Sequence, residues 1–291
     1  MDEPDSLSNT RIAIVGLGLI GGSLALALRG HCRSLWAVDP DPETQRLALE
    51  NQIVDRIFDD PVVVLPKADL VILATPVRII LRLISQLPDL HPGKPVVLDL
   101  GSTKARICQA YQSLPERFDP IGGHPMCGKE SSGLKQAEAG LFLGSAFALT
   151  PLERTSLRAR SLGAQVVEAV GARAVWLDPA THDRWTAATS HMPYLLSIAL
   201  SLATPPEAAP LIGPGFQSVS RLAGSSTVMM GDILDTNREN VLSALSLFRA
   251  HLEQLELSLR QGNEPGLMTG LIRGQQARSR LLAAQAEGGA G

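Results

Sequence analysis

Cysteine is scarce in this chain, and the three that occur (Cys32, Cys108 and Cys127) have neither metal-site spacing nor the pattern of a disulfide framework. Their scarcity favours a reducing cytoplasm and predicts no bound metal. No apolar run is long enough to span a membrane, and the polar, acidic first ten residues do not resemble a signal peptide. The formal net charge of -3 gives no reason to expect nucleic acid or an anionic membrane as a partner. We therefore expect a cytoplasmic protein without membrane or nucleic-acid partners.

The first half of the chain alternates short apolar runs with helical patterns, as in a parallel sheet covered by helices on both faces. Strands are predicted at residues 11–16, 35–39, 70–74, 96–100 and 174–177, and helices at 19–29, 43–51 and 77–87. After Asp178 the strand-like runs give way to long helical patterns, and Asp178-Pro179 resembles a helix cap with a first-turn proline. We expect an α/β domain over residues 1–177 and an all-α domain over residues 178–291.

One helix of the second domain shows a long apolar seam. Its members recur at alternating steps of four and three: Val241, Leu245, Phe248, Leu252, Leu255 and Leu259. This pattern fits a helix packed inside its own domain or a helix that pairs with a second copy, and the length of the seam favours a dimer. Thr236 and Glu239 have the spacing of a capping box at its start.

A glycine-rich segment, Gly16-Leu17-Gly18-Leu19-Ile20-Gly21, follows the first predicted strand and opens the first helix. The glycines of such a motif allow a tight turn and close approach of a pyrophosphate, and the helix N-terminus favours its charge. This context predicts a Rossmann-type, doubly wound parallel sheet that binds a dinucleotide. The residues expected to bind the cofactor here are Gly16, Gly18, Leu19, Ile20 and Gly21.

Asp39 ends the next predicted strand. It lies at the customary distance after the glycine motif for the acidic residue that binds the adenosine ribose. Its carboxylate can accept hydrogen bonds from both adenosine ribose hydroxyls and would repel a 2′-phosphate. No arginine adjoins it, because Pro40, Asp41 and Pro42 follow. NAD is therefore favoured over NADP; the alternative for Asp39 is a helix cap or turn residue.

Later strands bring further polar residues to the edge where parallel sheets bind ligands. Thr75 and Pro76 follow one strand, and Ser102 follows the next, where it can face the ligand or cap a helix over residues 103–109. His124 lies in Gly122–Glu130, whose glycines and proline suit neither helix nor strand. A histidine on such a loop can serve as an acid or base near neutral pH, or be incidental to a surface turn.

Together these segments resemble the prephenate/arogenate dehydrogenase family of tyrosine biosynthesis, from about Arg11 to Leu259. The resemblance rests on Gly16–Ser23, Asp99–Lys104, Gly123–Gly128, Ser190–Pro193, and Gly215-Phe216 with Ser220-Arg221. The histidine-proline-methionine segment is the specific one, because many dehydrogenases share the glycine motif. The resemblance implies a Rossmann domain, a helical domain that forms a homodimer, and NAD-dependent oxidative decarboxylation of prephenate, arogenate or both.

The resemblance also implies roles by position. His124 would accept the proton of the ring hydroxyl as hydride leaves, and Ser102 would hold that hydroxyl in line. Arg221 would clamp the ring carboxylate, because a guanidinium fork binds two oxygens at once. His191 would lie near the substrate side chain, and Glu130 would gate the pocket or pair with a cation. Spacing alone favours other interpretations of two of these residues. Arg221 would be a solvated or dimer-interface arginine, and His191 would be a core or helix-cap histidine.

Three residues depart from the family pattern. Cys127 stands where the family usually has alanine, Lys129 where a small or hydroxyl residue is common, and Gln217 where some prephenate-using members have a basic residue. We expect Lys129 and Gln217 near the substrate's side chain, so the choice between prephenate and arogenate stays open.

Two other interpretations compete with this one. A β-hydroxyacid dehydrogenase would need a lysine of the helical domain as its acid/base, but no lysine follows Lys135. A non-catalytic NAD-sensing protein would not need His124, Ser102 and Arg221 together. The combination of these residues favours the enzyme.

Overall fold

The structure, a computed structural model, describes residues 6–287. The first five residues of the polar N-terminal segment lie outside the described part. Contacts within the chain divide it into two compact units, residues 1–238 and residues 239–291. None of the helices in the described part is long and apolar enough to cross a membrane.

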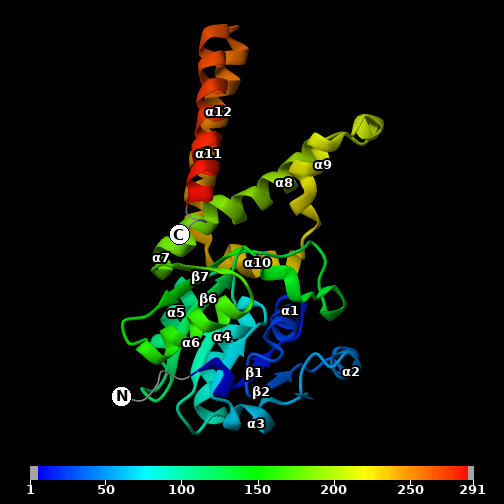
Figure 1. Ribbon diagram of the computed structural model, residues 1–291. Coiled ribbons are helices and arrows are strands. Elements are labelled where there is room, and N and C mark those ends of the chain that lie inside the picture. Colours follow the sequence, from blue (N-terminus) through cyan, green and yellow to red (C-terminus); the bar gives the residue numbers. More distant parts are fainter. Residues whose placement is uncertain (1–5, 288–291) are drawn as a thin grey trace. The chain divides into compact units, whose positions relative to one another are not determined.

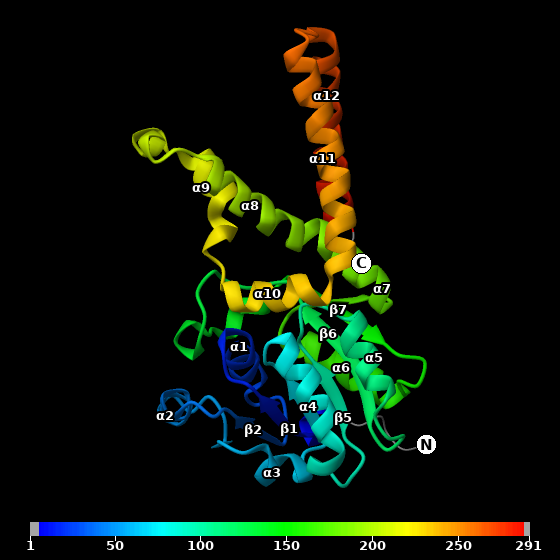
Figure 2. The ribbon, with the colours of Figure 1, turned by 180° about the vertical axis from the view of Figure 1, so that it is seen from behind.

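The first unit is built on one eight-stranded sheet (Figures 1 and 2). Its strands are β1 Arg11–Val15, β2 Ser34–Val38, β3 Arg56–Phe58, β4 Leu70–Leu73, β5 Val96–Asp99, β6 Asp119–Pro125, β7 Ala146–Pro151 and β8 Arg173–Trp176. Their order is β3-β2-β1-β4-β5-β6-β7-β8, and all neighbours pair in parallel except β6 and β7. The doubly wound sheet is therefore confirmed. Its direction of winding reverses between β1 and β4, the place where such sheets bind ligands.

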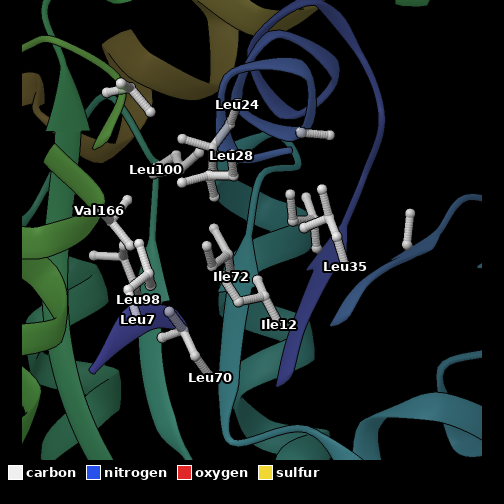
Figure 3. Close-up of a cluster of buried hydrophobic side chains, with 14 of the residues drawn as sticks. Leu7, Ile12, Leu24, Leu28, Leu35, Leu70, Ile72, Leu98, Leu100 and Val166 are labelled. Carbon is white, nitrogen blue, oxygen red and sulfur yellow. The ribbon is translucent and has the colours of Figure 1, made fainter. Parts of the chain in front are cut away.

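Helices cover both faces of this sheet: α1 Leu19–Leu28, α2 Pro42–Glu50, α3 Pro61–Val64, α4 Val77–Leu90, α5 Ala105–Gln112 and α6 Leu157–Ala169. Side chains alternate along a strand, so Ile12 and Ile14 enter the core under α1 and α6, whereas Ala13 and Val15 enter the core under α4 and α5. Figure 3 shows the first of these cores, where Leu24 and Leu28 of α1 meet Ile12 and Ile72 of the sheet.

After β8 the first unit continues only in helices: α7 Pro179–Thr186, a π-helical turn Ala187–His191, α8 Met192–Ala203, α9 Pro214–Ser220 and α10 Thr227–Thr236. Helix α7 packs against α5, and α10 packs against α4 at the carboxyl-end edge of the sheet (Figure 2). These contacts explain why residues 179–238 group with the sheet. The boundary between residues 177 and 178 stays a prediction about the organisation of the chain.

The second unit contains α11 Arg238–Arg260, apart from its first residue, and α12 Glu264–Glu287. Gly262, with φ of 59°, allows the turn between them. The helices approach closely at Leu255, whose Cδ2 would lie 2.8 Å from a Cβ added at Gly270. Part of the seam thus packs within its own unit, while Leu252 and Leu259 remain 52% and 65% exposed.

The predicted capping box is wrong. Thr236 is the last residue of α10, and its hydroxyl donates to the backbone carbonyl of Asp232 at 2.8 Å. It also shares a 2.9 Å hydrogen bond with the hydroxyl of Thr103, which precedes α5. The residue therefore ties α10 to the sheet and does not cap α11.

Candidate active site

The glycine-rich segment forms the turn between β1 and α1, and each glycine meets a different constraint. Gly16 has φ of 96°, and a Cβ there would lie 2.7 Å from Thr75 Cγ2. A Cβ on Gly21 would lie 1.9 Å from the carbonyl oxygen of Gly16, so the helix could not pack on the turn. Nothing lies within 4 Å of a Cβ at Gly18, the N-cap of α1. A tight turn, close helix packing and an open helix N-terminus are what a dinucleotide pyrophosphate requires.

Asp39 lies beside this turn, half-buried at the end of β2. Its carboxylate accepts hydrogen bonds from the backbone N–H of Leu17 at 2.8 Å and of Asp41 at 3.0 Å. Asp39 does not cap a helix, because Asp41 caps α2 by accepting from Thr44. The hydroxyl of Thr75, which follows β4, is buried and has no hydrogen-bond partner among the described residues. A braced carboxylate and an unpaired hydroxyl beside an open glycine turn fit a bound dinucleotide.

The expectation of a loop at His124 is wrong, because Gly122, Gly123, His124 and Pro125 belong to β6. His124 pairs with Ala148 of the antiparallel strand β7. The glycines are needed because the neighbours are close: a Cβ on Gly122 would lie 2.1 Å from the hydroxyl oxygen of Thr150, and one on Gly123 would lie 2.7 Å from the carbonyl oxygen of Asp99. Crowding inside a sheet, and not a turn, explains this composition.

His124 is held by a chain of buried hydrogen bonds that runs into α7. Its Nδ1 lies 2.9 Å from Nε2 of His182, and Nδ1 of His182 lies 2.8 Å from Oδ1 of Asp183. His182 and Asp183 are each 1% exposed, and His124 is 8% exposed. Burial, with the nearby His182 as a second cause, holds the pKa of His124 well below its usual range. The imidazole of His124 is therefore neutral at neutral pH.

The Asp183 carboxylate also caps α5. Oδ1 accepts from the backbone N–H of Lys104 at 2.7 Å, and Oδ2 accepts from that of Ala105 at 2.9 Å. The prediction that this helix starts at residue 103 under a Ser102 cap is therefore wrong, since α5 starts at Ala105. Ser102 lies half-buried in the segment that follows β5, the strand that pairs with β6, and its hydroxyl does not cap α5.

A fully buried ion pair lies at the carboxyl ends of β5 and β6. Lys104 and Asp99 are both 0% exposed, and their side chains are in direct contact. The Lys104 ammonium also donates to the carbonyl oxygen of Gly123 at 2.7 Å, and Asp99 accepts from the backbone N–H of Gly101 at 2.9 Å. The pair therefore links β5 to the residue just before His124. Both residues belong to the Asp99–Lys104 segment of the family pattern, and no role was predicted for either.

His191, in the π-helical turn, is also buried. The Asn237 amide donates to the carbonyl of Asp183 at 2.7 Å and meets Nδ1 of His191 at 3.1 Å. With Nδ1 accepting, Nε2 carries the hydrogen, and this Nε2 is buried with no hydrogen-bond partner in the described part of the chain. Burial lowers the pKa of His191 to about 4, so it presents a neutral donor. Within residues 6–287, no group of three or more His, Cys, Asp or Glu side chains could hold a metal ion.

The four remaining predicted substrate-binding residues lie at the surface. Arg221 forms an ion pair with Glu130, and their side chains are 60% and 37% exposed. Gln217 is exposed on α9. Lys129 turns toward a different segment, since its ammonium meets the carboxylate of Glu138 at 2.9 Å and the carbonyl of Gln136 at 3.2 Å. Arg221 and Glu130 are therefore in contact, whereas Lys129 pairs with Glu138.

This fold and site define a dinucleotide-binding α/β protein with an added helical part. The chain belongs to the prephenate dehydrogenase family: residues 24–176 match its nucleotide-binding domain, and residues 178–273 match its dimerization domain. The family thus favours the first interpretation over a β-hydroxyacid dehydrogenase.

Individual relatives agree with this family. The chain is 31% identical over 268 residues to prephenate dehydrogenase of Bacillus subtilis, covering 88% of this chain and 72% of that protein. A solved structure of prephenate dehydrogenase from A. aeolicus, in complex with hydroxyphenyl propionate and NAD+, has a TM-score of 0.87 and 30% identity, covering 95% of this chain and 100% of that one. Arogenate dehydrogenase of Synechocystis has a TM-score of 0.77 and 30% identity, covering 93% and 99%.

Proposed function

We propose that this chain catalyses the NAD-dependent oxidative decarboxylation of prephenate to 4-hydroxyphenylpyruvate, of arogenate to tyrosine, or of both. The observation that carries the proposal is the buried, neutral His124. Its Nδ1 is anchored by His182 on one side, and its Nε2 makes no hydrogen bond with the described residues. A base held in this way lies at the carboxyl-end edge of the sheet, the edge where the glycine turn would hold a dinucleotide.

The chemistry requires little beyond orientation and one base. NAD supplies the acceptor for the hydride that leaves the hydroxyl-bearing ring carbon. As that hydride departs, His124 Nε2 takes the hydroxyl proton, and Ser102 holds the oxygen in line. The bond from the ring to its carboxylate then breaks, carbon dioxide leaves, and the electron pair makes the ring aromatic. His124 returns the proton to the phenolic oxygen, so no net proton is gained or lost.

The remaining polar groups suit the carboxylates of such a substrate. Arg221 presents a guanidinium whose present partner, Glu130, is an exposed carboxylate, and exposed ion pairs are weak. A substrate carboxylate can therefore replace Glu130 on Arg221, which gives Glu130 the role of a gate. The unpaired Nε2–H of His191 can donate to an oxygen of the side chain of the substrate.

Gln217 and Lys129 were both expected to lie near the side chain of the substrate, and their surroundings differ. Gln217 remains our candidate, because it is exposed one helical turn before Arg221. Lys129 is less well supported, since Glu138 already neutralises it. We further propose that the exposed apolar residues of α11 form a homodimer seam, in keeping with the dimerization-domain match.

The test of this function is the absorbance of NADH formed from NAD with prephenate, run beside arogenate. Turnover of either substrate supports the proposal, and the ratio of the two kcat/KM values gives the preference. NAD binding without turnover of either would favour a non-catalytic NAD-sensing protein.

Asp39→Asn should raise the KM for NAD about 10- to 100-fold, because a charged hydrogen bond to the ribose contributes roughly 1.5–3 kcal/mol. The wild-type enzyme should have a much lower KM for NAD than for NADP, and the variant should narrow that gap. Asp41→Asn is the matched control, since asparagine also caps a helix and this side chain serves α2. Equal wild-type KM values for the two cofactors would contradict the assignment of Asp39.

Arg221→Ala should raise the KM for the substrate, because it removes a bidentate partner of the ring carboxylate. A loss of about 10- to 100-fold is expected from a charge-assisted hydrogen bond, with kcat much less affected. Arg33→Ala is the control, since Arg33 is exposed at the amino-end edge of the sheet, before β2. Steady-state kinetics separates the two parameters, and an effect confined to kcat would exclude the clamp.

A further inference from the structure

We infer that His182 and Asp183 are positioning residues that fix the tautomer of His124 and thereby make its Nε2 the base. This inference rests on the proposed function, since it explains how that function's base is prepared. Neither residue stood out in the sequence, where His182 and Asp183 are neighbours on an ordinary helical stretch.

Asp183 is at the far end of the hydrogen-bond chain, and its partners show which atoms donate to it. Oδ1 lies 2.7 Å from the backbone nitrogen of Lys104, and Oδ2 lies 2.9 Å from that of Ala105. Both backbone groups are donors, so both oxygens accept hydrogen bonds, as the oxygens of a carboxylate do. The third neighbour, Nδ1 of His182 at 2.8 Å from Oδ1, must then donate as well.

A neutral imidazole has one donor nitrogen and one acceptor nitrogen. With its hydrogen on Nδ1, His182 offers a lone pair at Nε2. Nδ1 of His124 lies 2.9 Å away and must therefore donate to it. The hydrogen of neutral His124 is thus on Nδ1, and Nε2 is the free acceptor. The opposite tautomer would present an N–H where the proton of the substrate has to arrive.

The same chain stabilises His124 after it has accepted that proton. The imidazolium of His124 donates from Nδ1 to His182, which is polarised in turn by the anionic Asp183. The proton stays on His124 and is available for return to the phenolic oxygen. In catalytic triads, a buried carboxylate orients a catalytic histidine and stabilises its protonated form in the same way. Here a second imidazole, that of His182, lies between the carboxylate and the histidine.

The direct test is nitrogen NMR of the wild-type protein labelled with ¹⁵N-histidine. The chain has only six histidines, so single variants assign the signals. We expect neutral His124 to show a protonated Nδ1 and an unprotonated Nε2. The opposite tautomer in the wild-type protein would overturn the inference. This readout needs no turnover, so it holds its meaning even if neither prephenate nor arogenate is a substrate.

Two variants complete the test. His182→Leu removes the acceptor, so kcat should fall about 10²-fold with little change in KM, and His124 should show mixed tautomers. His182→Gln returns an acceptor oxygen near the position of Nε2 and should recover part of kcat and the Nδ1–H tautomer. Equal kcat losses in the two variants, with unchanged His124 signals, would assign His182 a merely structural role.

His91→Gln is the matched control. His91 is also a buried histidine with two hydrogen bonds, to the carbonyl of Ala68 at 2.9 Å and from the backbone N–H of Gly93 at 3.0 Å. It lies near the amino end of β4, away from the carboxyl-end edge that carries His124. Its replacement should lower stability without changing kcat or the tautomer of His124.

Discussion

Replacing His124 by asparagine should lower kcat by about 10²–10⁴-fold, the usual contribution of a general base. Asparagine places an amide nitrogen close to the position of Nδ1, so the hydrogen bond to His182 can persist and the fold should be kept. Nothing in the variant can take a proton at the position of Nε2. Substrate binding should therefore survive while turnover is lost, which single-turnover and binding measurements can separate.

His31→Asn is the control for this variant, since His31 is exposed and lies beyond the C-terminal end of α1, away from the site. The pH dependence gives a second check. Because the pKa of His124 lies well below its usual value, the base is neutral across the neutral range, and kcat/KM should stay level there. The rate should fall only as the pH drops through that lowered pKa. Wild-type turnover in His124→Asn would exclude His124 as the base.

Replacing Lys104 by methionine should destabilise the protein by about 3–5 kcal/mol, because it leaves the Asp99 carboxylate buried without its counter-charge. Methionine keeps much of the volume of the lysine side chain, so the loss reflects charge and hydrogen bonding more than packing. The lysine also anchors the carbonyl of Gly123, so activity should fall as β6 loosens before His124. Chemical denaturation followed by circular dichroism measures the change in the free energy of unfolding.

The double variant Asp99→Leu/Lys104→Met should recover much of this loss, because a buried ion pair can often be replaced by apolar side chains at little cost. Burial raises the pKa of Asp99 in the wild-type protein, and Lys104 opposes that rise. In Lys104→Met alone, the pKa of Asp99 should therefore lie further above its unfolded value of about 3.9. The folded state then binds the proton more tightly, so its stability is greatest in acid and falls as the pH rises through the raised pKa. A loss under 1 kcal/mol at neutral pH would contradict this account of the pair.

Much of the fold was predictable because its signals are local. Buried parallel strands are short apolar runs, and G-x-G-x-x-G between a strand and a helix has a physical reason at each glycine. The short strand β3 and the strand β7 were missed, because each is defined mainly by its pairing with distant residues. Gly122 and Gly123 looked like a loop, since the sequence does not show that Thr150 and Asp99 crowd the positions where a Cβ would lie.

The sequence by itself determined the doubly wound sheet, the position of the cofactor turn and the family, with His124 as its distinctive residue. Only the tertiary structure decided what holds that histidine. His182 and Asp183 follow His124 by 58 and 59 residues. Because α7 packs on α5, His182 comes into contact with His124, and Asp183 supports His182 from behind. The Asp183 carboxylate caps α5 and also orients His182, which in turn orients His124. Such a hydrogen-bond chain depends on distances of about 3 Å between segments far apart in the sequence, which no local pattern of residues can specify.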